Sequence, residues 1–229
     1  MLTLYIANKN YSSWSLRPWV LLRELGIPFE EKLVPFGTAP GDTARAFRAF
    51  SPSGRVPCLV DGALTVWDSL AITEYLAEQH PNVWPADIAA RAFARCGAAE
   101  MHSGFMALRT QCGMNCGIRV KLYRVDAALQ HDLTRLCELW NTGLERFGGP
   151  FLAGVKFTAI DAFFAPVAFR IQTYTPTLDE ASNAYAGRLL ALPAMRVWYR
   201  AALAETLRDQ AHDQEARDWG EITQDLRAV

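Results

Sequence analysis

Two adjacent serines, Ser12 and Ser13, lie where the sequence changes from a polar loop to a helical pattern. We predict a helix from about Trp14 to Leu25, because apolar residues recur there at helical spacing and Gly26 provides a C-terminal stop. A hydroxyl at the N-terminus of a helix can stabilise a thiolate, helped by the positive end of the helix dipole, and so lower a thiol pKa that is otherwise about 8.5. The alternative is that both serines only cap the helix.

A second group of polar residues surrounds a predicted β-hairpin. A short apolar strand that contains Pro57 leads into Asp61-Gly62, a strong signal for a two-residue hairpin turn. Asp68 and Ser69 then open another helix, whose first N–H groups can bind a carboxylate. Each feature also has a structural explanation, since proline is common in edge strands and an Asp-Ser pair is common at helix caps.

Taken together, this order and spacing resemble the glutathione-binding half of the glutathione transferases. The resemblance implies that Pro57 is cis and that the main chain of Val56 binds the cysteinyl unit of glutathione. It implies further that Ser69, with Asp68 beside it, binds the γ-glutamyl end. Arg55 is a candidate for the glycyl carboxylate, with a solvated surface arginine as the alternative.

The loop sequence YSSWSLRPW resembles the serine-type members of this family, and most of all the zeta (maleylacetoacetate isomerase) class with its bacterial relatives. When Arg17 and Gly26 are aligned with that pattern, the serine that stabilises the thiolate is Ser12, with Ser13 as the second candidate. Trp14 occupies the position where the zeta motif has a cysteine. This difference argues against the isomerase assignment and leaves no cysteine in the loop for mixed-disulfide chemistry.

The resemblance implies a fold of the class α/β plus all-α. Residues 1–80 are expected to form a thioredoxin-like βαβαββα domain that binds glutathione, and the prolines of residues 80–85 indicate a linker. Residues 86–229 are expected to form an all-helical domain that supplies the pocket for the electrophile. Long helices are predicted over residues 86–112, 121–147 and 193–207. We expect the charged tail that follows to pack loosely.

Thr158 and Asp161 have the spacing of a helix capping box, just before an apolar run. Asp161 could be mistaken for a catalytic carboxylate. The box follows Phe151-Leu-Ala-Gly, and the combination resembles the folding motif of this family, so we predict a structural role for both residues.

The pocket for the second substrate is expected on the first long helix of the helical domain. Its candidate lining residues are Met101, His102, Phe105, Met106 and Arg109. Methionine and phenylalanine suit an apolar electrophile, although a stripe of these residues at helical spacing is also typical of a core. His102 is expected either to polarise a substrate carbonyl or to bond within the domain interface.

The cysteines do not indicate a metal site or a disulfide framework. The chain has five, an odd number, and Cys112 and Cys116 stand one helical turn apart without a second pair. With His102 they would form an incomplete ligand set. We therefore predict no metal.

Composition excludes some classes of partner. The 229 residues carry a net charge of −1, which gives no electrostatic reason to expect binding to nucleic acid or to an anionic membrane. The first residues, MLTLYIANKN, lack the layout of a signal peptide, and no apolar run is long enough to span a bilayer. A cytoplasmic protein is the expectation.

Two functions follow from these patterns. The first is an enzyme that ionises glutathione beside Ser12, so that the thiolate attacks a hydrophobic electrophile. The outcome is conjugation, as in detoxification, or cis–trans isomerisation by reversible addition. The alternative is a non-catalytic regulatory or partner-binding protein with the same fold. The resemblance implies a homodimer in both cases.

Overall fold

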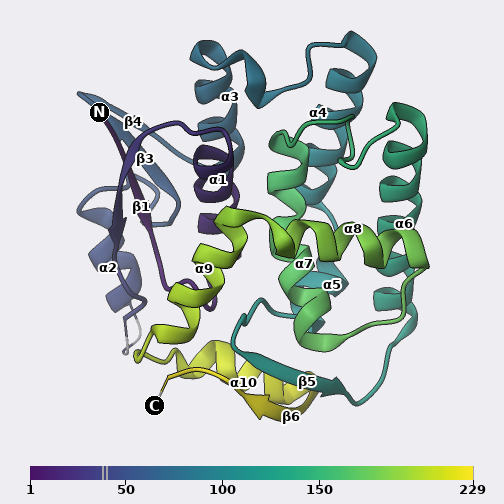
Figure 1. Cartoon of the computed structure of the whole chain (residues 1–229). Coiled ribbons are helices and arrows are strands. Elements are labelled where there is room, and N and C mark those ends of the chain that lie inside the picture. Colours follow the sequence, from purple (N-terminus) through teal and green to yellow (C-terminus); the bar gives the residue numbers. More distant parts are fainter. Residues whose placement is uncertain (38, 40, 229) are drawn as a thin grey trace.

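The computed structural model of the chain describes residues 1–37, 39 and 41–228 (Figure 1). Its first part follows the predicted order βαβαββα. The elements are β1 (Leu2–Ile6), α1 (Ser13–Glu24), β2 (Phe29–Leu33), α2 (Asp42–Arg48), β3 (Cys58–Asp61), β4 (Leu64–Val66) and α3 (Ser69–Gln79).

These strands form one mixed sheet with the order β2-β1-β3-β4. β1 is parallel to β2 and antiparallel to β3, and β3 is antiparallel to β4, as the hairpin signal at Asp61-Gly62 predicts. Leu4 and Ile6 alternate with more exposed residues and are fully buried, so one face of β1 joins the core. The thioredoxin-like order predicted from the sequence is therefore confirmed.

The rest of the described chain is mostly helical. It contains the short 3-10 helix η1 (Pro81–Val83), α4 (Ile88–Ser103), α5 (Met106–Gln111), β5 (Ile118–Leu122), α6 (Ala127–Phe147), α7 (Ala159–Tyr174), α8 (Glu180–Ala191), α9 (Pro193–Ala204), α10 (Gln210–Trp219) and β6 (Gly220–Asp225). The central helix is α7, which is buried along almost its whole length and packs against α1, α4 and α8. Through α1 it also joins the helical part to the sheet.

Two of the predicted long helices are shorter than expected. The helix over residues 86–112 is broken between α4 and α5, because Phe105 adopts a left-handed conformation with φ 56° just after Gly104. The helix over residues 121–147 begins only at Ala127, where Asp126 caps it by accepting a bond from the Leu129 N–H at 2.9 Å. The residues before it form β5, whose apolar side chains at alternate positions are buried.

The prediction of a loosely packed C-terminal tail is wrong. Residues after α9 form α10 and β6, and β6 pairs antiparallel with β5 (Figure 1). Near the end of the chain, the buried Arg227 pairs with Asp213 at 2.7 Å and with Asp225 at 2.6 Å. Its guanidinium also donates to the hydroxyl of Tyr11 at 2.8 Å, so the tail is fixed to the loop before α1. Charged side chains of the segment that we expected to pack loosely therefore form ion pairs with one another.

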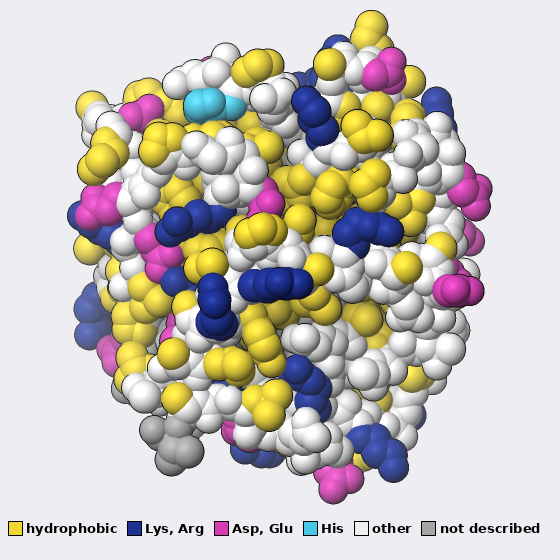
Figure 2. Space-filling model, in the orientation of Figure 1, with side chains coloured by type: hydrophobic (Ala, Val, Ile, Leu, Met, Phe, Trp, Pro, Cys, Tyr) yellow, Lys and Arg dark blue, Asp and Glu magenta, His cyan; other side chains and the backbone are white. Residues whose placement is uncertain are grey.

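The face of the molecule drawn in Figure 2 carries lysine and arginine side chains interspersed with acidic and apolar ones. This mixture agrees with the net charge of −1. Within residues 1–37, 39 and 41–228, no helix combines the length and the apolar character that crossing a membrane requires.

The capping box at the start of α7 is present, and Asp161 is its centre. The buried carboxylate accepts hydrogen bonds from the N–H of Leu152 at 3.1 Å, the N–H of Thr158 at 2.9 Å and the hydroxyl of Tyr185 at 2.8 Å. Burial raises the pKa of Asp161 to about 6, and these hydrogen bonds oppose the rise. The residue therefore connects α7, α8 and the preceding loop.

We expect Asp161→Ala to lower the free energy of unfolding by about 3 kcal/mol, because it leaves several buried donors without a partner. Tyr185→Phe is the matched control, since it removes one donor and leaves the carboxylate bonded to the backbone; about 1 kcal/mol is expected. Urea denaturation followed by tryptophan fluorescence measures both. Equal losses for the two variants would contradict the central role of Asp161.

Candidate functional site

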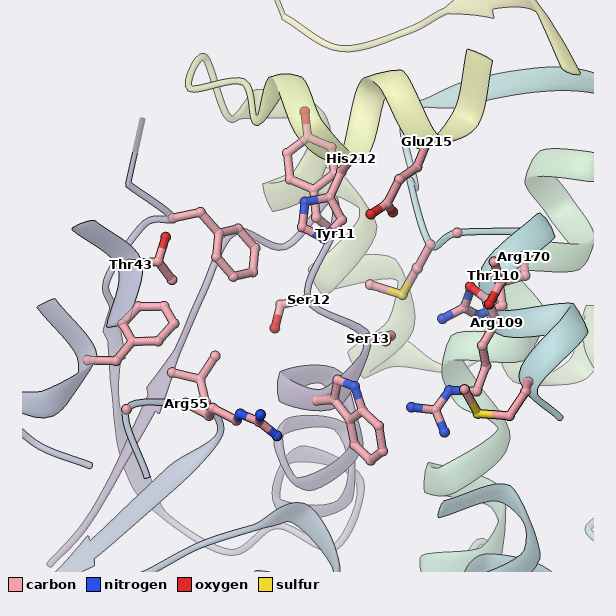
Figure 3. Close-up of a pocket in the computed structure, with 18 residues that line it drawn as sticks. Tyr11, Ser12, Ser13, Thr43, Arg55, Arg109, Thr110, Arg170, His212 and Glu215 are labelled. Atoms are coloured by element: carbon pink, nitrogen blue, oxygen red, sulfur yellow. The ribbon is translucent and has the colours of Figure 1, made fainter. Parts of the chain in front are cut away.

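The predicted thiol-activating serines face a cavity of about 450 Å³ between the sheet and the helices (Figure 3). Ser12, Ser13 and Trp14 line it from the start of α1, and Arg55 and Val56 line it from the loop before β3. A second cavity of about 450 Å³ shares Trp14, Arg55 and Val56 with the first and extends to the start of α3. The two cavities form one cleft, which we call the interdomain cleft.

The Ser12 hydroxyl does not cap its helix. Ser12 occupies the N-cap position of α1, yet its side chain makes no capping hydrogen bond and instead donates to Oγ of Ser15 at 2.7 Å. Ser15 is fixed in turn, since its Oγ accepts from the N–H of Ala7 at 3.3 Å. Ser12 is only 5 % exposed but lines the cavity. Ser12 therefore does not cap α1 through its side chain.

Ser13 is the first residue of α1 and lines the same cavity. It is half-buried, so it is more accessible than Ser12. The positive end of the α1 dipole acts on both hydroxyls, because the effect is concentrated in the first turn. The preference for Ser12 over Ser13 stays a prediction from the sequence.

On the opposite side, the peptide bond between Val56 and Pro57 is cis, as the resemblance implied. Asp68 caps α3 by accepting from the Leu70 N–H at 3.0 Å, and both Pro57 and Asp68 line the second cavity. Ser69 differs from the expectation, because its side chain is fully buried and lines neither cavity. Its hydroxyl has no hydrogen-bond partner among the described residues.

Of the five candidates for the electrophile pocket, Met106 and Arg109 line the interdomain cleft. Met101 and Phe105 do not: both are buried in the core, which was the alternative explanation for the Met/Phe stripe. His102 does not line the cleft either. Its Nε2 lies 3.4 Å from Oδ2 of Asp68, so the ring lies between α4 and the start of α3. The break at Gly104 explains the division, because α4 packs against α7 while α5 turns toward the cleft.

Several residues that line the cleft were not predicted. They are Tyr11, Phe36, Thr43, Phe47, Ser53, Gly54, Trp67, Thr110, Gly113, Met114, Arg170, His212 and Glu215. The ring of His212 stacks against Tyr11 and Phe36, with centroids 5.1 and 5.2 Å apart, and so closes one end of the cleft. His212 and Glu215 belong to α10, a helix that the sequence did not predict.

Tyr11 is next to Ser12 but its hydroxyl is already engaged. It donates to Asp213 at 3.2 Å and accepts from Arg227. Burial, and after it the charge of Asp213, raise the pKa of Tyr11 to about 12. Tyr11 therefore supports the fold at this point and has no free proton to donate into the cleft.

The cysteines lie outside this chemistry. Among the described residues, the five cysteines are free thiols and no three His, Cys, Asp or Glu side chains gather as metal ligands. Burial raises the pKa of Cys112 to about 12 and also raises that of Cys116, which keeps both thiols protonated.

Comparison with known proteins agrees with this geometry. Residues 11–79 match the family model described as "Glutathione S-transferase, N-terminal domain", a range that contains Ser12, Pro57 and Asp68. A zeta class glutathione S-transferase of Euphorbia esula is 29 % identical over 68 % of this chain and 70 % of its own length.

Two solved structures are similar over nearly the whole chain. A glutathione transferase homologue from Burkholderia, with bound glutathione, is 25 % identical, covers 88 % of this chain and 97 % of its own, and gives a TM-score of 0.65. The theta class enzyme of Xanthomonas axonopodis pv. citri, also with glutathione bound, is 26 % identical, covers 90 % and 99 %, and gives a TM-score of 0.63. Motifs, fold and relatives agree: residues 11–79 belong to the N-terminal domain family of the glutathione S-transferases, and the chain as a whole has the glutathione transferase fold.

Proposed function

We propose that the interdomain cleft binds glutathione and that Ser12 stabilises its thiolate for attack on a small electrophile. The observation that carries the proposal is the position of the Ser12 hydroxyl at the start of α1, in one cavity with the main chain of Val56 before the cis proline. The glutathione bound in the two related structures supports the choice of ligand.

In this proposal, the cysteinyl unit bonds to the main chain of Val56 and the γ-glutamyl unit lies at the start of α3. Asp68 accepts from the ammonium group, and the first N–H groups of α3 bind the carboxylate. Arg55 is placed for the glycyl carboxylate, because it lines both parts of the cleft. Ser69 is left out of this site, because the whole residue is buried and lines neither cavity.

The chemical step requires the Ser12 proton to turn from Ser15 toward the sulfur. The two oxygens are 2.7 Å apart, and rotation about one side-chain bond breaks this contact. The helix dipole and the hydroxyl then favour the thiolate over the thiol. In conjugation, the sulfur forms a bond to carbon and a leaving group departs with its electron pair; in isomerisation, the same bond forms and breaks again.

We propose in addition that the enzyme is a homodimer. Apolar side chains are exposed beside the start of α3, where Leu64 is 56 % and Trp67 44 % accessible, and such a patch is typical of a protein interface. A cytoplasmic location and a role in detoxification stay predictions from the sequence.

For the thiolate, we expect Ser12→Ala to lower kcat/KM at neutral pH about a hundredfold, because one donor to the developing charge is lost. The pH dependence of kcat/KM should also shift. The apparent pKa of bound glutathione should lie below about 8.5 in the wild type and move up toward it in the variant, so activity is regained at high pH. Ser13→Ala is the control and should keep the wild-type pH profile.

If Ser13→Ala loses activity and Ser12→Ala does not, the thiolate-stabilising residue is Ser13. A wild type that binds glutathione without turnover would instead favour the non-catalytic alternative.

For the homodimer, sedimentation equilibrium should give about twice the chain mass of 25.5 kDa. Trp67→Glu should shift the distribution toward single chains, because it places a charge in the apolar patch. A wild-type mass of one chain at micromolar concentration would contradict the proposal.

A further inference from the structure

Arginine side chains approach the interdomain cleft from opposite walls. Arg55 extends from the loop before β3, while Arg109 of α5 and Arg170 of α7 extend from the helical side toward the two serines (Figure 3). Arg109 lines both parts of the cleft.

None of these three guanidiniums has a carboxylate partner within 4 Å among the described residues. The arginines that do form ion pairs, such as Arg45, Arg95 and Arg135, lie elsewhere. The absence is unusual for Arg170, which is only 5 % exposed, because a buried charge normally has a paired anion.

Arg109 and Arg170 donate hydrogen bonds to neutral acceptors, and the carboxylate that acts on the charge of Arg170 is that of Glu215 in the same cavity. Nη1 of Arg170 donates to the backbone carbonyls of Arg109 and Cys112, and its Nε has no partner in the described chain. Burial lowers the pKa of Arg170 to about 10. Arg109 donates to the carbonyl of His102 at 3.1 Å, and its guanidinium stacks on Trp14 at 4.3 Å from the ring centroid. Both side chains are thus held in place by neutral groups.

A further positive charge lies next to Trp14. Arg17 is 2 % exposed and its guanidinium also stacks on this ring, 4.1 Å from the centroid. Its Nε and Nη1 have no partner among the described residues. The acidic groups that line the cleft are Asp68 and Glu215. Three guanidiniums therefore line the cleft with two carboxylates, and the charge of Arg17 lies beside it.

Glutathione can use only part of this positive charge. In the proposed function, its two carboxylates lie at Arg55 and at the start of α3, on the side of the sheet. Arg109 and Arg170 are on the helical wall, which also includes Thr110 and Met114. The second substrate must contact this wall when it approaches the sulfur beside Ser12.

We infer that the physiological electrophile carries a carboxylate, which Arg109 and Arg170 bind on the helical wall of the cleft. This inference rests on the proposed function and specifies its second substrate. It replaces the purely apolar electrophile that the Met/Phe stripe suggested, since Met101 and Phe105 are core residues. Arginine suits the role because its planar fork donates two hydrogen bonds to one carboxylate.

A matched pair of aryl chlorides tests the inference: 4-chloro-3,5-dinitrobenzoate and 4-chloro-3,5-dinitrobenzamide. With either probe, the thiolate forms the C–S bond at the chlorinated carbon and chloride leaves with the C–Cl electron pair. The two probes differ mainly in charge. Each enzymatic rate is divided by the rate of the uncatalysed reaction with glutathione, so that the intrinsic reactivity of the probe cancels. We expect the wild type to prefer the acid over the amide by about tenfold or more in kcat/KM, the effect of a charge-assisted hydrogen bond.

Arg109→Met should reduce this preference about tenfold. Arg109→Lys, which keeps the charge without the fork, should retain part of it. Arg124→Met is the matched control, because Arg124 is an exposed arginine that lines neither cavity, and it should keep the wild-type preference. The KM for glutathione, measured in parallel, shows whether Arg109 acts on glutathione instead. A preference that is absent in the wild type, or unchanged in Arg109→Met, would overturn the inference.

Binding of the unreactive analogues 3,5-dinitrobenzoate and 3,5-dinitrobenzamide, followed by quenching of tryptophan fluorescence, does not depend on turnover. Tighter binding of the acid by the wild type, lost in Arg109→Met, supports the anion site even if conjugation fails. Equal binding of both analogues overturns it. Turnover of the amide without preference for the acid would contradict the inference but not the proposed function.

Discussion

The position of Ser12 depends on the carboxylate of Glu205, which holds the preceding loop from the far end of the chain. Glu205 accepts from the main-chain N–H of Lys9 at 2.6 Å and of Asn10 at 3.2 Å. On the other side of the same loop, Nε1 of Trp198 donates to the carbonyl of Lys9 at 2.9 Å. Residues 7–12 are all buried as well. These bonds fix its backbone, so the serines keep their place at the start of α1.

The cleft concentrates positive charge in the site that, in the proposed function, a thiolate and two carboxylates enter. Helix termini contribute partial charges, and the arginines contribute full ones that form no ion pair within 4 Å among the described residues. Such an arrangement costs stability in the empty protein, because Arg17 and Arg170 are desolvated. An anionic ligand offsets the cost when it binds. The same groups therefore favour ligand binding and ionisation of the thiol.

The sheet and its motifs could be predicted because their signals are local. Pro57, Asp61-Gly62 and Asp68 each specify a turn, a hairpin or a cap within a few residues, and the strands pair as those signals require. The C-terminal elements could not be predicted in this way. β6 is a strand only because β5 offers it an edge, and α10 is fixed by the pairing of Asp213 with Arg227. The contributions of His212, Glu215 and Arg170 to the cleft depend on contacts between distant segments, which residue spacing does not reveal.

A crystal structure of the protein with glutathione would test the role of Ser12 most directly. We expect the sulfur to lie within hydrogen-bond distance of the Ser12 hydroxyl, which has turned away from Ser15, and the cysteinyl unit to bond to the main chain of Val56. Glutathione bound elsewhere, or a sulfur directed away from both serines while Ser12 stays bonded to Ser15, would contradict it.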